Sequence, residues 1–360
     1  MPSRLPRRAS SPPALPALDL ALQGGGSHGA FTWGVLDRLL EDLPARLDGV
    51  SGTSAGALNA AVLATGLAQG GPERAREALR AFWADVARAG DCFGRPDADE
   101  RAPRPGLALD PVWTAPMMGW WQAWLRLFSP SQLNPWGLNP LRDIVERHVD
   151  VQALREGPLQ VFVTATAVHT GQPRVFDRHD LSIDALMASA CLPHLFPAVM
   201  IDGEPYWDGG YSGNPALWPL IYQTSATDVM LVKINPLVRA ATPTSVLEIA
   251  DRASEITFNA ALVGEMRAIA FVRRLLAEER LPSDRYKSLR LHMIADEKVL
   301  AGLPASTKLS TDAAQMERLF DAGRAAAAAW LARHRGDLGR RNTLDVEAAF
   351  LSPRRATDAA

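Results

Sequence analysis

The fold is decided by residues 17–66, which read ALDLALQGGGSHGAFTWGVLDRLLEDLPARLDGVSGTSAGALNAAVLATG. Apolar residues alternate with polar or small ones over residues 18–22, a pattern typical of a strand. After a glycine-rich turn, apolar residues recur at helical spacing from Phe31 to Leu40. A second short strand over residues 47–50, another glycine-containing turn and an Ala/Leu-rich helix follow. This order predicts an α/β fold built on a parallel sheet.

A Gly-x-Ser-x-Gly motif occupies Gly52–Gly56, between the second strand and its helix, with Ser54 at its centre. A serine on so tight a turn is held in a strained conformation with its hydroxyl exposed, and flanking glycines keep side chains out of the turn. The helix that begins at Ala55 also directs the positive end of its dipole at this point. The motif therefore predicts a nucleophilic serine.

The earlier glycine-rich turn, Gly24–Gly29, also follows a strand and opens a helix, and it has two interpretations. As a GxGxxG motif of Gly24, Gly26 and Gly29 it would bind a dinucleotide, which requires an acidic residue at the end of the next strand. That strand ends in the serine turn instead, and Asp48 precedes its apolar end. As an oxyanion hole the loop would offer backbone N–H groups to a reacting ester. The neighbouring serine motif favours the oxyanion hole.

A third motif, Asp208-Gly209-Gly210, places a carboxylate where a strand is expected to end. The two glycines allow positive φ angles. Alone, the motif is a common turn. It indicates a functional site only in combination with the two motifs that precede it.

The three motifs together, in this order, resemble the patatin-like phospholipases, a family of lipid acyl hydrolases. Ser189–Pro197 and Gly213–Pro215 resemble the family as well, and the resemblance covers residues 17–235. One departure is His28, because the family usually has Arg or Lys at this position. A neutral imidazole would weaken the positive charge near the loop, whereas the backbone donors do not depend on it; a locally bonded residue at the helix start is the alternative role for His28.

The resemblance implies a three-layer α/β/α fold with a mostly parallel central sheet and added C-terminal helices. It implies a Ser54–Asp208 dyad without a histidine, and an acyl-enzyme intermediate. Because an aspartate is a weak base at neutral pH, the site must desolvate Asp208 to raise its pKa. The implied oxyanion hole consists of Gly24, Gly25, Gly26 and Ala55, and the residues that support the motifs are Gly29, Gly52, Gly56, Gly209 and Gly210. No cofactor and no metal are expected.

Alternatives to this mechanism remain open at the level of sequence. The chain order Ser54, Asp208, His292 matches the triad of α/β-hydrolase esterases, but the place of His292 on an alternating strand favours a surface or hydrogen-bonded histidine without a catalytic role. A nucleotide-binding protein that uses Gly24–Gly29, and a non-catalytic protein with a hydrolase-like fold, are further alternatives.

The remaining sequence suggests one catalytic domain with additions. Residues 1–16 are expected to form a disordered basic, Pro-rich tail, residues 17–235 the catalytic domain, residues 236–345 a helical extension packed on it and residues 346–360 a second tail. A Trp/Met-rich insertion over residues 107–140 would form a lid, an acyl-chain channel or core. Within the extension, residues 244–281 predict a helix with a core stripe of Ile249, Ile256, Leu262, Met266, Ile269 and Leu275.

Composition excludes several classes of protein. The 360 residues contain 38 Lys+Arg and 40 Asp+Glu, so no broad positive field favours nucleic acid as a partner. Two cysteines far apart, Cys92 and Cys191, argue against a disulfide framework. Prolines interrupt the N-terminal apolar residues, which disfavours a signal peptide, and no apolar run is long enough for a membrane span. We expect a cytoplasmic protein, with or without peripheral association with a membrane, that acts on a lipid or ester substrate.

Overall fold

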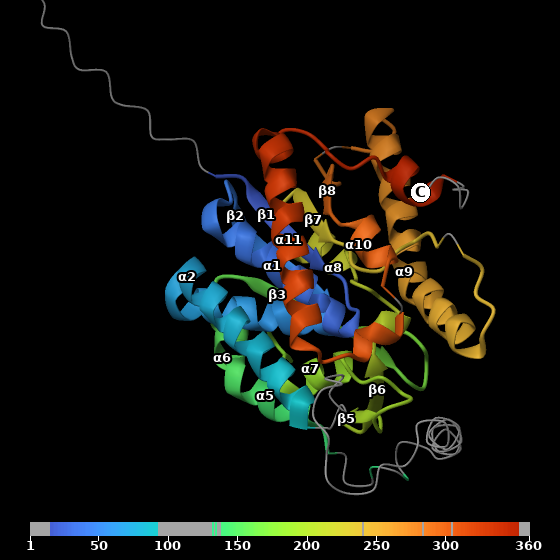
Figure 1. Cartoon of the computed structure of the whole chain (residues 1–360). Coiled ribbons are helices and arrows are strands. Elements are labelled where there is room, and N and C mark those ends of the chain that lie inside the picture. The colour runs from blue at the N-terminus through green and yellow to red at the C-terminus, as the bar shows by residue number, and fades with distance from the viewer. Residues whose placement is uncertain are drawn as a thin grey trace, which may run out of the picture.

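A computed structural model describes residues 15–92, 132, 134, 138–239, 241–282, 284–303 and 305–352 (Figure 1). Most of the Trp/Met-rich insertion predicted over residues 107–140 lies outside the described residues, and so do residues 1–14 of the expected N-terminal tail and residues 353–360 of the C-terminal one. At the C-terminus, the short helix η5 (Glu347–Leu351) is described and contacts α9 (Val246–Ala277).

The centre of the molecule is an eight-stranded mixed sheet with the order β5-β6-β3-β2-β1-β7-β8, while β4 pairs with β3. The five strands from β3 to β8 in this order run parallel, and β4, β5 and β6 are antiparallel to their neighbours. The expected mostly parallel sheet is therefore confirmed. The strands are β1 (Ala17–Leu22), β2 (Arg46–Thr53), β3 (Gln160–Ala167), β4 (Pro173–Phe176), β5 (Val199–Ile201), β6 (Glu204–Asp208), β7 (Asp228–Val232) and β8 (Arg290–Ile294).

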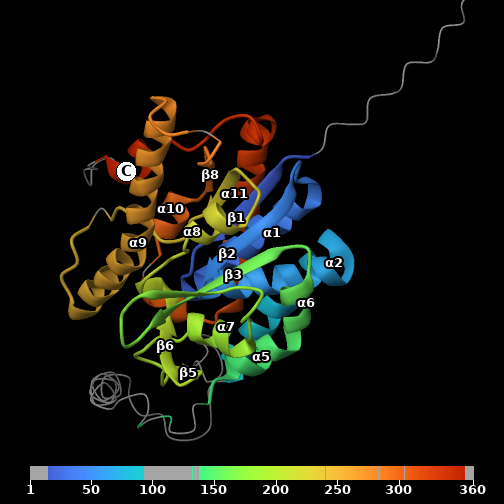
Figure 2. The same ribbon diagram turned by 180° about the vertical axis from the view of Figure 1, so that it is seen from behind.

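Helices cover both faces of the sheet, as the views from opposite sides show (Figures 1 and 2). The alternation of apolar residues along each strand creates the two layers: Leu18, Leu20 and Leu22 of β1 pack in one core, and Ala21 packs in the other. The first core is shared with α1 (Gly29–Asp42), α2 (Ala55–Cys92), α5 (Pro140–His148), α6 (Val151–Glu156), α7 (Ile183–Ser189) and α11 (Ala313–His334). The second is shared with α8 (Trp218–Gln223), α9 and η5.

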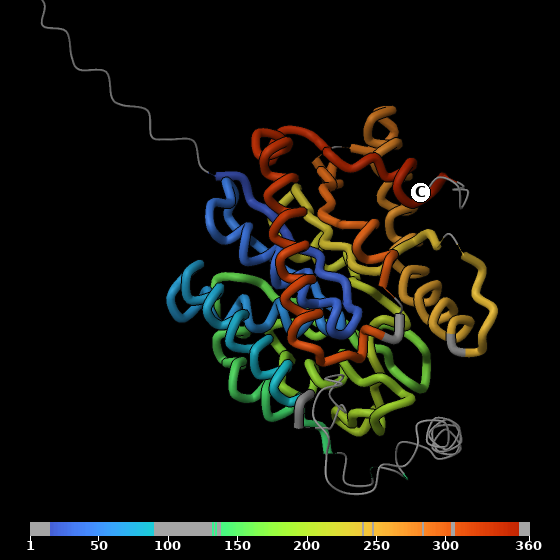
Figure 3. Tube along the Cα trace, viewed as in Figure 1, coloured from blue at the N-terminus to red at the C-terminus, as the bar shows by residue number. Residues whose placement is uncertain are grey.

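The first and last long helices of the fold lie side by side, as the tube trace shows (Figure 3). Glycines allow this close approach, since a Cβ on Gly34 of α1 would lie 2.0 Å from the Phe320 carbonyl oxygen. A Cβ on Gly323 of α11 would lie 2.1 Å from the Phe31 carbonyl oxygen. The packing of α11 on α1 thus ties the C-terminal region to the start of the chain. In the described part of the chain, no helix has the length and the apolar character needed to cross a membrane.

We expect Gly323→Ala to lower the free energy of unfolding by about 1–3 kcal/mol, because the added methyl group forces α1 and α11 apart. The matched control is Gly264→Ala on α9, where an added Cβ meets nothing within 4 Å. Since alanine favours a helix over glycine, the control should gain up to about 1 kcal/mol. Denaturant unfolding of both variants measures the difference, and equal effects would contradict the close packing.

Candidate active site

Ser54 stands between the end of β2 and the start of α2, in the left-handed region of the backbone with φ = 53°. Its amide donates a hydrogen bond of 2.8 Å to Oγ of Ser189, which in turn donates one of 2.6 Å to the carbonyl oxygen of Thr164. A non-glycine residue rarely adopts such a φ unless its surroundings enforce it. The hydrogen bond that the Ser54 amide donates to Ser189 of α7 is one of the contacts that hold this φ.

The pairing of β2 and β6 with neighbouring residues of β3 brings Asp208 close to Ser54. Thr53, the last residue of β2, pairs with Thr164, and Asp208, the last residue of β6, pairs with the next residue, Ala165. A Cβ on Gly209 would lie 2.9 Å from Cγ2 of Thr53, so the two strand ends meet. The structure therefore brings together two sequence-predicted residues that are 154 positions apart (208 − 54).

The Asp208 carboxylate is fully buried. Its Oδ1 accepts a hydrogen bond of 2.7 Å from the Gly210 amide, whereas Oδ2 has no hydrogen-bond partner among the described residues. Burial raises the pKa of Asp208 to about 7, against the opposing effects of the Gly210 amide and the nearby Ser54 hydroxyl. Because Oδ2 accepts no hydrogen bond of ordinary geometry in this state, it is available as a proton acceptor.

The glycine-rich loop after β1 lies against the serine turn. A Cβ on Gly24 would lie 2.8 Å from Cβ of Ser54. Two asparagines fix the Gly24 backbone: its amide donates to Oδ1 of Asn214 at 2.6 Å, and its carbonyl oxygen accepts from Nδ2 of Asn235 at 2.7 Å. The Gly24 N–H is thus already bonded, while the Gly25 and Gly26 N–H groups donate to no described residue.

The other glycines of the three motifs occupy places where two segments touch. A Cβ on any of them would lie 2.1–2.7 Å from another heavy atom, closer than real Cβ atoms come. One of these contacts joins two motifs, since Gly29 meets Ala55, while Gly209 meets Thr164 of β3. The residues are Gly29, Gly52, Gly56, Gly209 and Gly210.

His28 is buried at the start of α1, where Nε2 lies 2.8 Å from Oγ1 of Thr307. Burial lowers the pKa of His28 to about 3, helped by the positive charges of Lys308 and Arg239 and opposed by Glu255. His28 is therefore neutral and supplies no positive charge to the loop. Its partner Thr307 lies 279 positions away in the chain, so the hydrogen bond is a tertiary contact and not the local bonding at the helix start that the sequence offered as an alternative.

The Ser54–Asp208–His292 triad is contradicted by the structure. His292 lies on β8, three strands from β2, which is about 14 Å across the sheet. Both ring nitrogens are bonded elsewhere, Nε2 at 3.0 Å to Asp228 and Nδ1 at 2.8 Å to Thr343. The chain order matched a triad, but it carries no information on which strands are neighbours.

A nucleotide site at Gly24–Gly29 also lacks the geometry it needs. The carboxylate of Asp48 accepts hydrogen bonds from residues 225 and 226 and from Arg46, so it does not project toward a ribose. The helix start is covered by η3 (Ala305–Leu309), since a Cβ on Gly26 would lie 2.1 Å from the carbonyl oxygen of Lys308. Among the described residues, no group of three or more His, Cys, Asp and Glu side chains could hold a metal ion.

Comparisons with known proteins place this geometry in context. A family model described as patatin-like phospholipase matches residues 20–221. The solved structure of VipD from Legionella pneumophila is 15% identical, with 87% of this chain and 68% of that chain covered and a TM-score of 0.36. The type III effector protein ExoU is 17% identical (90% and 54% covered, TM-score 0.32), and the ExoU–SpcU complex from Pseudomonas aeruginosa is 16% identical (91% and 53%, TM-score 0.36). The chain thus spans about half the length of these last two matched chains, and no curated protein matches it.

The pKa of Asp208 predicts a pH-dependent gain in stability for Asp208→Asn. The folded protein holds a proton on Asp208 up to about pH 7, whereas the ordinary pKa of an aspartate is 3.8, so the cost of the buried charge develops as pH rises from about 4 to about 7. We expect the variant to exceed the wild type in stability at pH 8 by a free energy of the order of 4 kcal/mol. The advantage should shrink as pH falls through 7 and vanish near pH 4.

Thermal unfolding at pH 8, 6 and 4 measures this effect. The control is Asp321→Asn, at an exposed position of α11. A stability difference for Asp208→Asn that stays constant over this pH range would show that the carboxylate is not titrating as the burial predicts.

Proposed function

Because the chain belongs to the patatin-like phospholipase family, we propose that it hydrolyses carboxylic esters of lipids through a catalytic dyad of Ser54 and Asp208. The observation that carries this proposal is the meeting of a serine on a strained turn with a buried carboxylate that has one free oxygen. No histidine is needed, because burial gives Asp208 the pKa of a base suited to neutral pH.

In the first half of the proposed reaction, Oδ2 of Asp208 accepts the proton of the Ser54 hydroxyl while Oγ attacks the ester carbonyl carbon. The carbonyl oxygen becomes an oxyanion, which accepts hydrogen bonds from the N–H groups of Gly25, Gly26 and Ala55. The C–O bond of the ester then breaks, and Asp208 returns its proton to the departing alcohol. An acyl group remains on Ser54.

In the second half, Asp208 accepts a proton from a water molecule, which attacks the acyl carbon. The resulting oxyanion uses the same N–H groups. Its collapse releases the fatty acid and returns the proton from Asp208 to Oγ of Ser54. One backbone donor in such a hole is typically worth about 3–4 kcal/mol of the barrier. Gly24, whose N–H is bonded to Asn214, contributes by position and not as a donor.

We also propose a division of the chain in which residues 17–235 carry the reaction and residues 236–345 support it. Two contacts favour this division. The helix α11 packs on α1, and η3 covers the glycine-rich loop. The extension would thus stabilise the loop that provides the oxyanion donors.

Turnover of a short-chain p-nitrophenyl ester tests the proposed dyad. Ser54→Ala and Asp208→Asn should each lower kcat by at least about 10³-fold, because each removes a group that acts in the bond-making step. In the wild type, kcat/KM should fall about tenfold per pH unit below pH 7, since protonated Asp208 cannot accept the serine proton.

A matched control tests whether another buried carboxyl group causes the fall of kcat/KM below pH 7. Burial also raises the pKa of Glu265 to about 7, but its side chain caps α8 by accepting hydrogen bonds from the Leu217 and Trp218 amides. Glu265→Gln should therefore keep the pH profile of the wild type. A limb that disappears in Glu265→Gln, or full turnover in Ser54→Ala, would contradict the proposed dyad.

His292→Ala distinguishes a structural histidine from a catalytic one. Burial raises the pKa of Asp228, but hydrogen bonds from His292, Arg290 and Gly339 outweigh it and lower the pKa to about 2. Removing the ring leaves a cavity and a buried carboxylate with one partner fewer, so we expect a loss of about 2–4 kcal/mol in unfolding free energy. At a temperature where the variant is folded, kcat should change less than about tenfold; a loss as deep as that of Ser54→Ala would restore the triad.

A further inference from the structure

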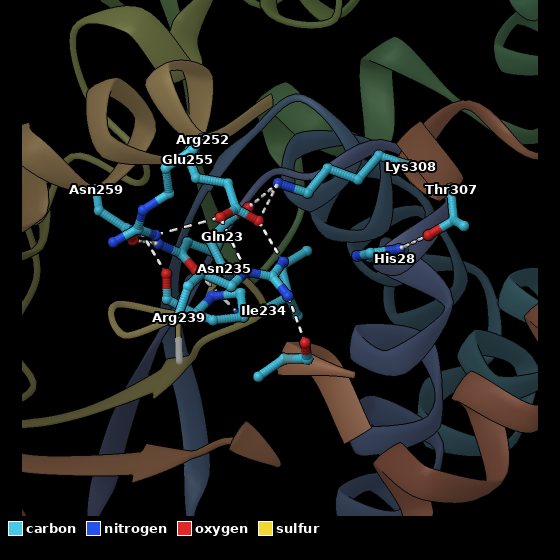
Figure 4. A network of polar contacts seen from close by, with 12 residues as sticks. Gln23, His28, Ile234, Asn235, Arg239, Arg252, Glu255, Asn259, Thr307 and Lys308 are labelled. Carbon is cyan, nitrogen blue, oxygen red and sulfur yellow. Dashed lines mark hydrogen bonds and ion pairs between the residues drawn. The ribbon is translucent and has the colours of Figure 1, made fainter. Parts of the chain in front are cut away.

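A buried polar network joins the glycine-rich loop to the C-terminal extension (Figure 4). Nζ of Lys308, on η3, donates a hydrogen bond of 2.7 Å to Oδ1 of Asn235. Nδ2 of Asn235 donates one of 2.7 Å to the carbonyl oxygen of Gly24. Lys308, Asn235 and Gly24 thus form a chain of hydrogen bonds that ends on the loop beside Ser54.

The last hydrogen bond fixes a peptide plane. The Gly24 carbonyl and the Gly25 N–H belong to the same planar, trans peptide group, so they point in opposite directions. When Asn235 holds the Gly24 carbonyl oxygen, the Gly25 N–H is held on the other side of the plane. A hydrogen bond to the carbonyl also polarises the peptide and strengthens its N–H as a donor.

The first hydrogen bond fixes which way the Asn235 amide faces. A lysine ammonium has donors only, so it must meet Oδ1, and this leaves Nδ2 for Gly24. Without the ammonium, Oδ1 loses this donor, and the hydrogen bond from Nδ2 to the Gly24 carbonyl oxygen must orient the amide alone. The Gly24 carbonyl oxygen also accepts a longer hydrogen bond, 3.4 Å, from Nδ2 of Asn214, so the peptide plane of Gly24 and Gly25 would be held less firmly and not released.

Other residues keep Lys308 in place. Its Nζ lies 3.9 Å from Oε1 of Glu255, a carboxylate on α9 that is only 2% exposed. Glu255 is in turn bonded by Arg239 through both Nε and Nη2 and by Arg252 at 3.3 Å. His28, on the same side of the loop, is neutral. The positive charge beside the loop therefore comes from the extension and not from residue 28.

We propose that Lys308 is a positioning residue for the oxyanion hole, which sets the direction of the Gly25 N–H through Asn235. The inference rests on the proposed ester hydrolysis at Ser54. It assigns the segment after α10 (Glu297–Ala301) a part in the rate of the reaction, although no side chain of that segment touches the reacting atoms.

The test uses Lys308→Met, Asn235→Ala and the double variant in the full chain. With a p-nitrophenyl ester as substrate, we expect each single variant to lower kcat about 10- to 100-fold and to change KM less than about threefold, because a misdirected donor affects the transition state more than the bound substrate. The loss of kcat in the double variant should be no larger than in the more impaired single variant, since both substitutions interrupt the same chain of hydrogen bonds.

A trifluoromethyl ketone provides a second readout, because its adduct with Ser54 carries an oxyanion. Its inhibition constant should rise by the same factor as kcat/KM falls, which a purely structural effect of Lys308 would not produce. The control is Lys298→Met, at an exposed position of α10, which should retain wild-type kcat, KM and inhibition constant. Thermal unfolding of every variant verifies that it is folded at the assay temperature.

The outcomes separate this inference from the proposed function. If the wild type turns over the ester and Ser54→Ala does not, then unchanged kcat in both Lys308→Met and Asn235→Ala, or additive losses in the double variant, would overturn the inference alone. If Lys308→Met is unfolded, Asn235→Ala decides by the same criteria of kcat and inhibition constant. No turnover by the folded wild type would contradict the proposed function, and this inference with it.

Discussion

The site depends on one constraint, the register of β3 with the strands whose ends meet at it. Thr53 pairs with Thr164 and Asp208 with Ala165, so the turn after β2 and the end of β6 are held at neighbouring residues of a single buried strand. A shift of one residue in the pairing of β6 with β3 would turn Asp208 to the other face of the sheet, and a shift in the pairing of β2 with β3 would displace Ser54. The glycines of the three motifs then permit the close approach of the segments that this register brings together.

The structure around the strand ends also holds the Asp208 carboxylate in a buried position, where its charged form is unfavourable. A fully buried carboxylate with one unpartnered oxygen is unfavourable in its charged form, and so is a serine with φ = 53°. Both are held by structure around them: the Ser54 amide is bonded to Ser189, and the Asp208 backbone is bonded through its amide to the Cys191 carbonyl and through its own carbonyl to Thr166. The rest of the fold thus stabilises an arrangement that is poor for stability and suited to proton transfer.

Much of the fold was predictable from local patterns. Alternating and helical apolar spacing predicted the first two strand–turn–helix units, and the alternating strand expected at His292 is β8. Predicting Ile249 and Ile256 as core was wrong, because the side chains are 52% and 55% exposed and the second apolar core takes only the later residues Leu262, Met266 and Ile269 from α9. Periodicity gives the apolar face of a helix but not how far the sheet extends beneath it.

The residues of the candidate site that could be predicted from the sequence are those that belong to short motifs. Ser54, Asp208 and the glycine-rich loop each stand in one, whereas Asn235, Glu255 and Lys308 have no local pattern and come together only through tertiary contacts. Chain order alone also suggested His292, which the strand order places far from Ser54. Residues that position a motif are therefore harder to find from sequence than the motif itself.

The most direct measurement of the central claim is the rate at which a fluorophosphonate labels the protein, with the labelled peptide identified by mass spectrometry. The account predicts a single label on Ser54 in the wild type, at a rate that falls at least about 100-fold when Asp208 is replaced by Asn, because the serine then has no base beside it. A label on another residue, or equal rates in the wild type and Asp208→Asn, would contradict the account.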